Sequence, residues 1–169
     1  MANTFELIAS STVGSSGAAS IDFSSIPSTY TDLVIKLSAA SNRAAIDTFR
    51  LTFNGSGSSY SGKILYGNGS AASSFSSSTS YISDIAANGT NYSNVFASDE
   101  IYIPNYAGSS NKSMSIDSTT EANATTSEMT MIAGLWSNTA AITSIKIAPN
   151  VGSLIIQYSS AYLYGVKNA

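Results

Sequence analysis

The sequence predicts an all-β protein: an antiparallel, jelly-roll-like β-sandwich formed by a single domain over residues 1–169. Three observations support this fold class. Short segments of alternating apolar and polar residues recur along the chain, and turn-forming residues separate them at the spacing of a sandwich or barrel. No window carries a convincing 3.6-residue apolar period. No repeat of fixed length is evident either, which disfavours a solenoid or a propeller.

Four strands are expected in the N-terminal part of the chain, at residues 4–10, 18–23, 30–39 and 46–53. Pro27 lacks an amide donor and has a fixed φ, so a strand through Phe23 must end before it. Ser and Gly make up five of the seven residues at 11–17, and we therefore interpret residues 1–17 as either an N-terminal arm or an edge strand.

The strand expected at 30–39 contains a continuous apolar run. Leu33, Val34 and Ile35 follow one another before Lys36 interrupts them. Such a run indicates a strand with one face in the core and the other face at least partly covered.

The alternating pattern weakens between residues 70 and 98, after a short strand expected at 61–66. Ser and Ala dominate residues 70–80 around a single Phe75, and 81–85 fit either a strand or one helical turn. A structureless loop of this length is uncommon in a compact domain. The region is therefore either functional or contains elements that its pattern does not reveal.

Regular alternation returns in the last 70 or so residues, bringing the total to roughly nine to eleven strands. In the strand expected at 126–136, Met129, Met131 and Ala133 share one face, while Ile132 and Gly134 share the other. Further strands are expected at 99–103, 112–119 and 142–147, with one or two more within 154–166.

The composition indicates a folded protein with a neutral, hydroxyl-rich surface. Charged residues make up 10% of the chain and hydrophobic residues 43%, whereas charged residues are about a quarter of a typical domain. Disordered chains combine low hydrophobicity with high net charge, and this chain has neither property.

Several classes of function are excluded or disfavoured by residue types. The net charge is −3 and the seven Lys and Arg residues are spread singly, so nucleic acid is an unexpected partner. The absence of Cys and His excludes disulfides, thiolate nucleophiles, Ser-His-Asp catalysis and His-ligated metals. Residues 1–6 lack the features of a signal peptide and no apolar run has the length of a membrane span, which predicts a soluble protein made in a cytoplasm, with no membrane partner.

The acidic residues give only weak candidates for a site. Asp99 and Glu100 are the one adjacent acidic pair, and paired carboxylates hydrolyse glycosides when a cleft holds them at a set separation. At the start of a strand, a solvated edge that discourages edge pairing is the better interpretation. A calcium site from Asp84, Asp99 or Glu121 has no ladder of ligands to support it. We therefore predict no catalytic residue, no metal and no cofactor.

Aromatic residues offer a second kind of candidate, because their faces stack on the apolar faces of sugars. Tyr60, Tyr92 and Tyr106 lie in turn-rich stretches and are expected to be exposed. Trp136 ends a hydrophobic strand and is expected to be packed. The six Asn-x-Ser/Thr sequences are attributed to chance in a chain so rich in Ser and Thr; they begin at Asn54, Asn68, Asn88, Asn91, Asn111 and Asn123.

Several phrases spread over nearly the whole chain resemble a group of small virion proteins of tailed bacteriophages, many from aquatic and cyanobacterial hosts. The resemblance rests on residues 5–10, 19–33, 53–55, 103–108, 133–136 and 161–165. It implies a β-sandwich virion component, either a capsid decoration (cement) protein or a module of the tail or its fibres. The family brings no catalytic residues to this sequence.

The expected function is therefore that of a capsid decoration protein, a homotrimer that binds the major capsid protein on the outer surface of the head and stabilises it. The alternative is a tail or tail-fibre module that binds a host-surface glycan through the loops between residues 55 and 98. An enzyme such as a glycosidase ranks below both. A surface with few charges suits extensive contact with neighbours, because little charge must be desolvated on association.

Overall fold

The computed structural model describes residues 4–44, 46–79, 81–85, 95–121 and 127–167, with only the backbone described for 81–85. Twelve strands form in this part of the chain, and every pairing between them is antiparallel. They are β1 (Phe5–Thr12), β2 (Ile21–Phe23), β3 (Asp32–Ala39), β4 (Asp47–Phe53), β5 (Tyr60–Gly67), β6 (Ala72–Ser77), β7 (Tyr81–Ile85), β8 (Ala97–Ile103), β9 (Lys112–Glu121), β10 (Ser127–Trp136), β11 (Ile145–Pro149) and β12 (Ser160–Val166).

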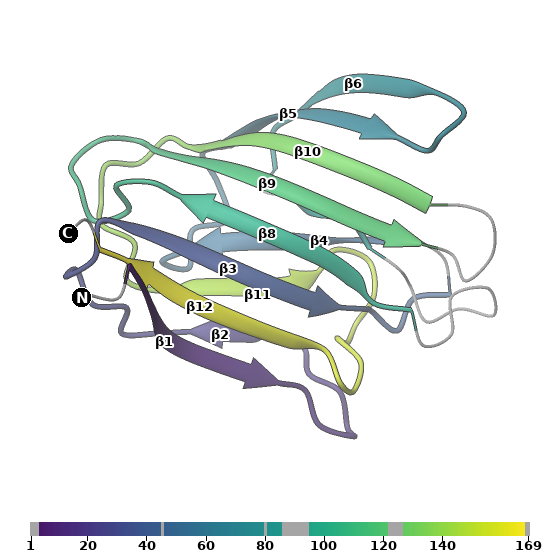
Figure 1. Cartoon of the computed structure of the whole chain (residues 1–169), viewed down its shortest axis with the longest axis horizontal. Helices are drawn as coiled ribbons and strands as arrows, with labels where there is room; N and C mark the ends of the chain where they lie inside the picture. Colours follow the sequence, from purple (N-terminus) through teal and green to yellow (C-terminus); the bar gives the residue numbers. More distant parts are fainter. Residues whose placement is uncertain (1–3, 45, 80, 86–94, 122–126, 168–169) are drawn as a thin grey trace.

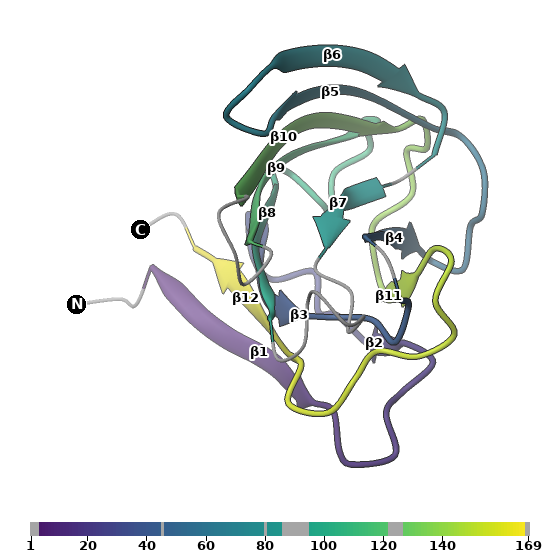
Figure 2. The ribbon, with the colours of Figure 1, turned by 90° about the vertical axis from the view of Figure 1, so that its right-hand side faces the viewer.

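The strands form two sheets that pack face to face, which confirms the predicted β-sandwich. The large sheet has eight strands in the order β1-β12-β3-β8-β9-β10-β5-β6, and the small sheet has four in the order β2-β11-β4-β7. Figure 1 looks onto the large sheet, with the small sheet behind it. Figure 2 shows the large sheet curving so that the small sheet lies on its concave side.

The order of the strands is that of a jelly roll with two inserted hairpins. If β5–β6 and β9–β10 are set aside, the chain passes back and forth between a sheet of order β1-β12-β3-β8 and one of order β2-β11-β4-β7. The hairpins follow β4 and β8 in the chain; in the large sheet β9 pairs with β8, and β5 pairs with β10 beyond it. They double the width of that sheet and extend its outer face.

The core fills the space between the two sheets because most strands turn an apolar face inward. β9 shows this clearly, since its residues alternate between buried and exposed along its whole length. The core is contributed by both sheets and includes Leu33, Ile35, Ile101, Ile103 and Ile116 from the large sheet, and Phe49, Leu51, Phe53, Ile145 and Ile147 from the small sheet.

The apolar residues of β3 are buried on both faces of the strand, as the sequence predicts. Leu33 and Ile35 are fully buried in the core, and Val34 on the opposite face is only 2% exposed. Val34 lies between Tyr164 of β12 and Tyr102 of β8 in the register of the sheet. These two large neighbours on the outer face are positioned to cover it, because β3 is an inner strand of the large sheet.

The structure decides between the alternatives that the sequence left open for two segments. The region from 70 to 98 contains elements that its pattern does not reveal, because β6 and β7 lie within it and residues 81–85 form a strand. At the N-terminus the edge-strand interpretation is right and the arm interpretation is wrong for residues 5–12, since β1 pairs with β12 along its length. The pairing continues through Ser11 and Thr12, into the Ser- and Gly-rich segment at 11–17.

Buried polar groups hold the loops at one end of the small sheet. Asp47 is 1% exposed, and its carboxylate accepts hydrogen bonds from the amides of Thr48, Val151 and Gly152. Asn42 accepts from the amides of residues 153 and 154 through its side-chain oxygen. The loop after β11 is therefore fixed by side-chain oxygens that replace backbone partners.

A buried lysine holds the connections on either side of the β9–β10 hairpin. Lys112 is fully buried, and its ammonium donates to the carbonyl oxygens of Gly108, Ser110 and Thr139. Burial lowers the pKa of Lys112, because desolvation disfavours its charged form. The three carbonyls offset this cost by satisfying the donors of the ammonium group.

Candidate functional site

The outer face of the large sheet is the candidate functional site. It is the face turned away from the core, and in β9 it carries mostly short side chains: Ser113, Ser115, Asp117 and Thr119 are all exposed. Longer side chains flank them on β8 and β10. The difference in length produces a shallow groove along β9.

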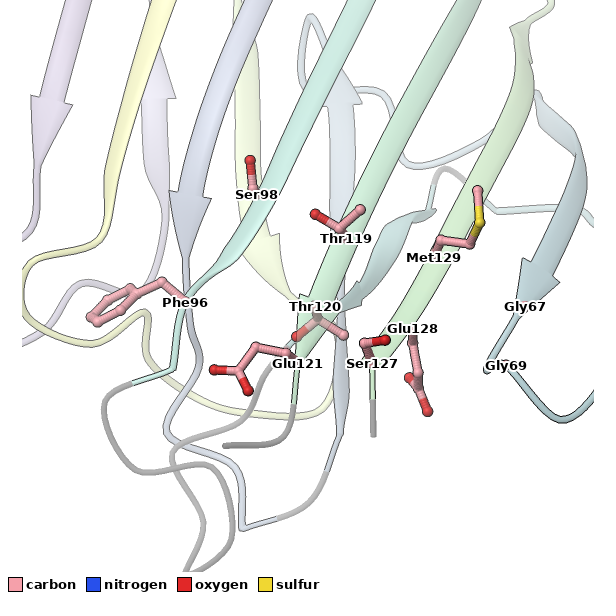
Figure 3. A pocket seen from close by; sticks show the side chains of 10 residues that line it. All are labelled: Gly67, Gly69, Phe96, Ser98, Thr119, Thr120, Glu121, Ser127, Glu128 and Met129. Atoms are coloured by element: carbon pink, nitrogen blue, oxygen red, sulfur yellow. The ribbon is translucent and has the colours of Figure 1, made fainter. Parts of the chain in front are cut away.

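Two adjoining hollows make up this groove. The first has a volume of about 260 Å³ and runs across β3, β8, β9 and β10, between Lys36 and Met131. The second, of about 470 Å³, lies at the end of the strands between Phe96 and Gly69 (Figure 3). Ser98, Thr119 and Met129 line both hollows, so the two are continuous.

Charged residues cross the middle of the groove in a single row. Lys36 forms an ion pair with Glu100 on the neighbouring strand, and Asp117 lies next in register on β9. The side chains of Lys36 and Glu100 are 53% and 48% exposed. An ion pair this exposed contributes only about 0–1 kcal/mol to folding, so the row is available to a partner at little cost.

The same row continues into an exposed apolar patch. Met131 lies between Asp117 of β9 and Leu65 of β5 in the register, and Met129 is two residues away on the same face. Leu65, Met129 and Met131 are 59%, 53% and 47% exposed. We call these three residues the Met–Leu patch. Large apolar side chains that gather on one exposed face make the patch a candidate contact surface.

The lining of the second hollow includes two residues with a buried oxygen that has no hydrogen-bond partner among the described residues. Glu128 and Thr120 face each other in the register of β9 and β10, and the unpaired atoms are Glu128 Oε2 and Thr120 Oγ1. Figure 3 shows both side chains beside the hollow. A donor group that enters this end of the groove would find acceptors there.

The interpretation of Asp99 and Glu100 as a solvated strand edge is wrong, because β8 lies between β3 and β9 inside the large sheet. The pair does not form a two-carboxylate site either. Asp99 is 3% exposed and points into the sandwich, whereas Glu100 points outward to Lys36. Successive residues of a strand face opposite ways, so the two carboxylates lie on opposite faces of the sheet. Glu121 lines the second hollow, and the side chain of Asp84 lies outside the described residues. No group of three or more Cys, His, Asp or Glu side chains suited to a metal occurs within the described ranges.

The prediction that Tyr60 and Tyr106 are exposed is wrong. Tyr60 is 7% exposed and Tyr106 is fully buried. The Tyr60 hydroxyl accepts a hydrogen bond from the amide of Phe53, and the Tyr106 hydroxyl donates to the carbonyl of Pro27. Tyr92 lies outside the described residues. Trp136 is 1% exposed, which confirms that it is packed.

The two buried tyrosines predict a loss of stability in alkali. Burial raises the pKa of Tyr60 and of Tyr106 above the ordinary value of about 10. The folded chain therefore keeps protons that the unfolded chain loses, so the stabilisation is present below about pH 10 and falls as the pH rises above it. Each tyrosine adds up to about 1.4 kcal/mol per pH unit to this decline.

Urea unfolding between neutral pH and pH 11 or so measures this effect. Tyr60→Phe is expected to reduce the alkaline slope of the free energy of unfolding, whatever it does to stability at neutral pH. Tyr158→Phe is the matched control, because Tyr158 is 71% exposed. An equal alkaline slope in Tyr60→Phe and wild type would show that the buried phenol does not govern the decline.

The alternation along β10 predicts that Met129 and Met131 share a face, but it does not reveal that this face is exposed. Both faces of β10 carry apolar side chains, with Ile132 and Trp136 on the other. The two-residue period of a strand assigns its side chains to two opposite faces, but it does not determine which of the two faces is buried. Leu65 belongs to the patch through pairing of β5 with β10, which the local sequence does not encode.

Comparison with protein-family models, curated proteins and solved structures found no match to this chain. In the part of the chain that the structure describes, no helix has the length and apolar character to span a membrane.

Proposed function

We propose that this chain is a structural protein of a tailed-phage virion that binds the major capsid protein on the outer surface of the head and stabilises the head. Its resemblance to small phage virion proteins is the reason for placing it there. The observation that supports a binding role is the Met–Leu patch on the outer face of the large sheet. In this proposal, that face is the surface applied to the head.

The chemistry of the face suits such a contact. Methionine side chains adapt to the shape of a partner, and burying them removes apolar area from water. Short Ser and Thr side chains around the groove lose little conformational freedom when they are covered. The charged row of Lys36, Glu100 and Asp117 crosses the face next to the patch, where a partner with complementary charges would fix the orientation of binding.

Met131→Glu is expected to weaken binding to the head at least tenfold, because it places a charge in the centre of the apolar contact. A tenfold loss corresponds to about 1.4 kcal/mol, which is within the range for a central contact residue. The assay is co-sedimentation of purified chain with heads assembled without it.

Val151→Glu is the matched control for this experiment. Val151 is 60% exposed and lies in the loop after β11, on the small-sheet side of the molecule. The proposal predicts that this variant binds like wild type. Equal binding of Met131→Glu and wild type would exclude the Met–Leu patch as the contact.

The homotrimer expected from the resemblance stays a prediction. In the proposal, three copies bind as a group at a symmetry axis of the shell. Sedimentation equilibrium of the purified chain tests this directly, and a mass that is not a multiple of three chains would contradict it.

A tail or tail-fibre module that binds a host-surface glycan is the second candidate. The groove beside the patch favours it, because the groove is lined by the hydroxyls of Ser98 and Thr119 and by the carboxylate of Asp117. Such groups bind sugar hydroxyls. This candidate predicts binding to host polysaccharide that Asp117→Ala weakens. Absence of binding to host cells and polysaccharides would exclude it.

A further inference from the structure

The strand β6 is an edge of the large sheet whose outer side has no partner in the described structure. It pairs with β5 alone, and the register of that pairing is continuous from Ala72 to Ser77 without a bulge. The strand contains only Ala, Ser and one Phe, and its residues are exposed or only partly buried. Such an edge offers a row of backbone donors and acceptors to another strand.

The other three edge strands carry features that discourage pairing. β1 has a bulge between Leu7 and Ala9, and its Glu6 forms an ion pair with Lys167. β2 has only three residues, with Asp22 in the middle. β7 pairs irregularly with β4 and has Asp84 in its sequence. β6 has no charge, no proline and no bulge, so it is the edge without this protection.

Two hydrogen bonds establish which backbone groups of β6 point outward. The amide of Asn68 donates to the carbonyl of Ala71 at 3.3 Å, in the register of the β5–β6 pair. The amide of Ser137 donates to the carbonyl of Ser59 at 2.8 Å, in the register of the β5–β10 pair. Along an antiparallel ladder, residue pairs that exchange backbone hydrogen bonds alternate with pairs that do not. Both of these hydrogen bonds assign the same residues of β5 to β6 and the same residues to β10.

It follows that Ser73, Phe75 and Ser77 direct their backbone groups to β5. The backbone groups of Ala72, Ser74 and Ser76 point away from the sheet. They form a regular row of donors and acceptors along the free edge.

We propose that a second copy of this chain pairs with β6 through its own β6, antiparallel, with Ser74 on the two-fold axis. Ser74 then pairs with Ser74 of the second copy, and Ala72 pairs with Ser76 of the second copy. This register uses every outward-facing backbone group of the strand. The large sheets of the two copies join into one continuous sheet across the axis.

The side chains of β6 agree with this arrangement. Phe75 is 52% exposed at the free edge of the sheet. In the proposed register it lies opposite Ser73 of the second copy and diagonal to the other Phe75, within reach of an aromatic ring. The contact therefore covers an apolar side chain that the single chain leaves half exposed.

A second copy fits the edge better than an open chain of copies. Joining β6 of one copy to β1 of the next would build a filament, and the bulge and the Glu6–Lys167 ion pair on β1 oppose it. Pairing β6 with β6 closes after two copies, and neither β6 strand contributes a charged residue to the contact. The proposed β6–β6 contact does not depend on the proposed role in a phage. It is compatible with the homotrimer if two trimers join into a hexamer.

Sedimentation equilibrium of the full chain and two variants tests the proposal. Ser74→Pro removes an outward amide and leaves the bonds to β5 intact, and Ser74→Lys places two like charges on the axis. Wild type is expected to contain an even number of chains, and both variants half that number. Ser115→Lys adds the same charge on the exposed outer face of β9 and is expected to keep the wild-type mass.

Circular dichroism identifies which variants keep the fold, and Ser74→Lys decides the result if Ser74→Pro does not fold. A wild-type mass of an odd number of chains, one included, would overturn the proposal. A mass that neither folded variant changes would also overturn it.

A single cysteine locates the contact, since the chain has no other cysteine. Ser74→Cys treated with a short bis-maleimide is expected to give a covalent dimer, whereas Ser115→Cys is expected to remain uncrosslinked. Crosslinking of Ser115→Cys alone would place the contact elsewhere and contradict the proposed axis.

Discussion

Trp136→Ala is expected to lower the free energy of unfolding by about 3–5 kcal/mol, the range for removing a fully packed tryptophan. Trp136 is 1% exposed, and its ring lies 5.5 Å from that of Phe53 in an edge-to-face arrangement. It stacks on Tyr60 at 6.3 Å between ring centroids. The three residues come from β10, β4 and β5, so the cluster ties both inserted hairpins to the small sheet.

Urea unfolding followed by circular dichroism measures this effect, because the variant lacks the only tryptophan. Leu65→Ala is the control, since Leu65 also lies in an inserted strand but is 59% exposed. It is expected to change stability by about 0.5 kcal/mol or less. Similar losses in the two variants would mean that the aromatic cluster does not hold the hairpins to the core.

Asp47→Ala is expected to lower the free energy of unfolding by roughly 2–4 kcal/mol, because it removes a buried acceptor and leaves three amide donors without their partner. The carboxylate accepts from the amides of Thr48 at 2.8 Å, Val151 at 3.1 Å and Gly152 at 2.9 Å. Its loss frees the end of β4 and the loop after β11 at the same time.

Two further substitutions separate the role of the acceptor from the loss of a charge. Asp47→Asn keeps one acceptor oxygen and is expected to fall between Asp47→Ala and wild type. Asp117→Ala removes an exposed carboxylate and is expected to have little effect on stability. If Asp47→Ala is as stable as Asp117→Ala in chemical denaturation, the carboxylate does not hold the loop.

The sequence predicts the fold class well where alternation is strong. β9 has a clear period of two, and the structure places its apolar residues in the core. β6 escapes prediction because a run of Ser and Ala has no apolar face. It becomes a strand by pairing with β5, so the information lies in another segment of the chain.

The misplaced tyrosines show a different limit. Tyr106 follows the turn formers Pro104 and Asn105, which correctly indicate a turn in the backbone. A turn does not determine where its side chains point, and this ring enters the core and bonds to Pro27. Local turn signals therefore predict backbone direction better than exposure.

The candidate site is less predictable than the fold, because it depends on contacts between distant strands. Leu65 and Met131 are far apart in the sequence and become neighbours only when β5 pairs with β10. Neither insertion of a hairpin nor its position in the large sheet follows from alternation alone. Predicting the exposed patch would therefore require the order of the strands in the sheet. That order is determined by pairing between segments that are distant in the sequence.

We propose that the outer face of the large sheet binds the head of a tailed phage. Electron microscopy of particles made with and without this chain tests this proposal most directly. The proposal predicts that particles with the chain show additional density on the outer surface of the head, with the large sheet against the shell, and that heads without it are less stable. Intact and equally stable heads that lack no density, or density for this chain on the tail, would contradict the account.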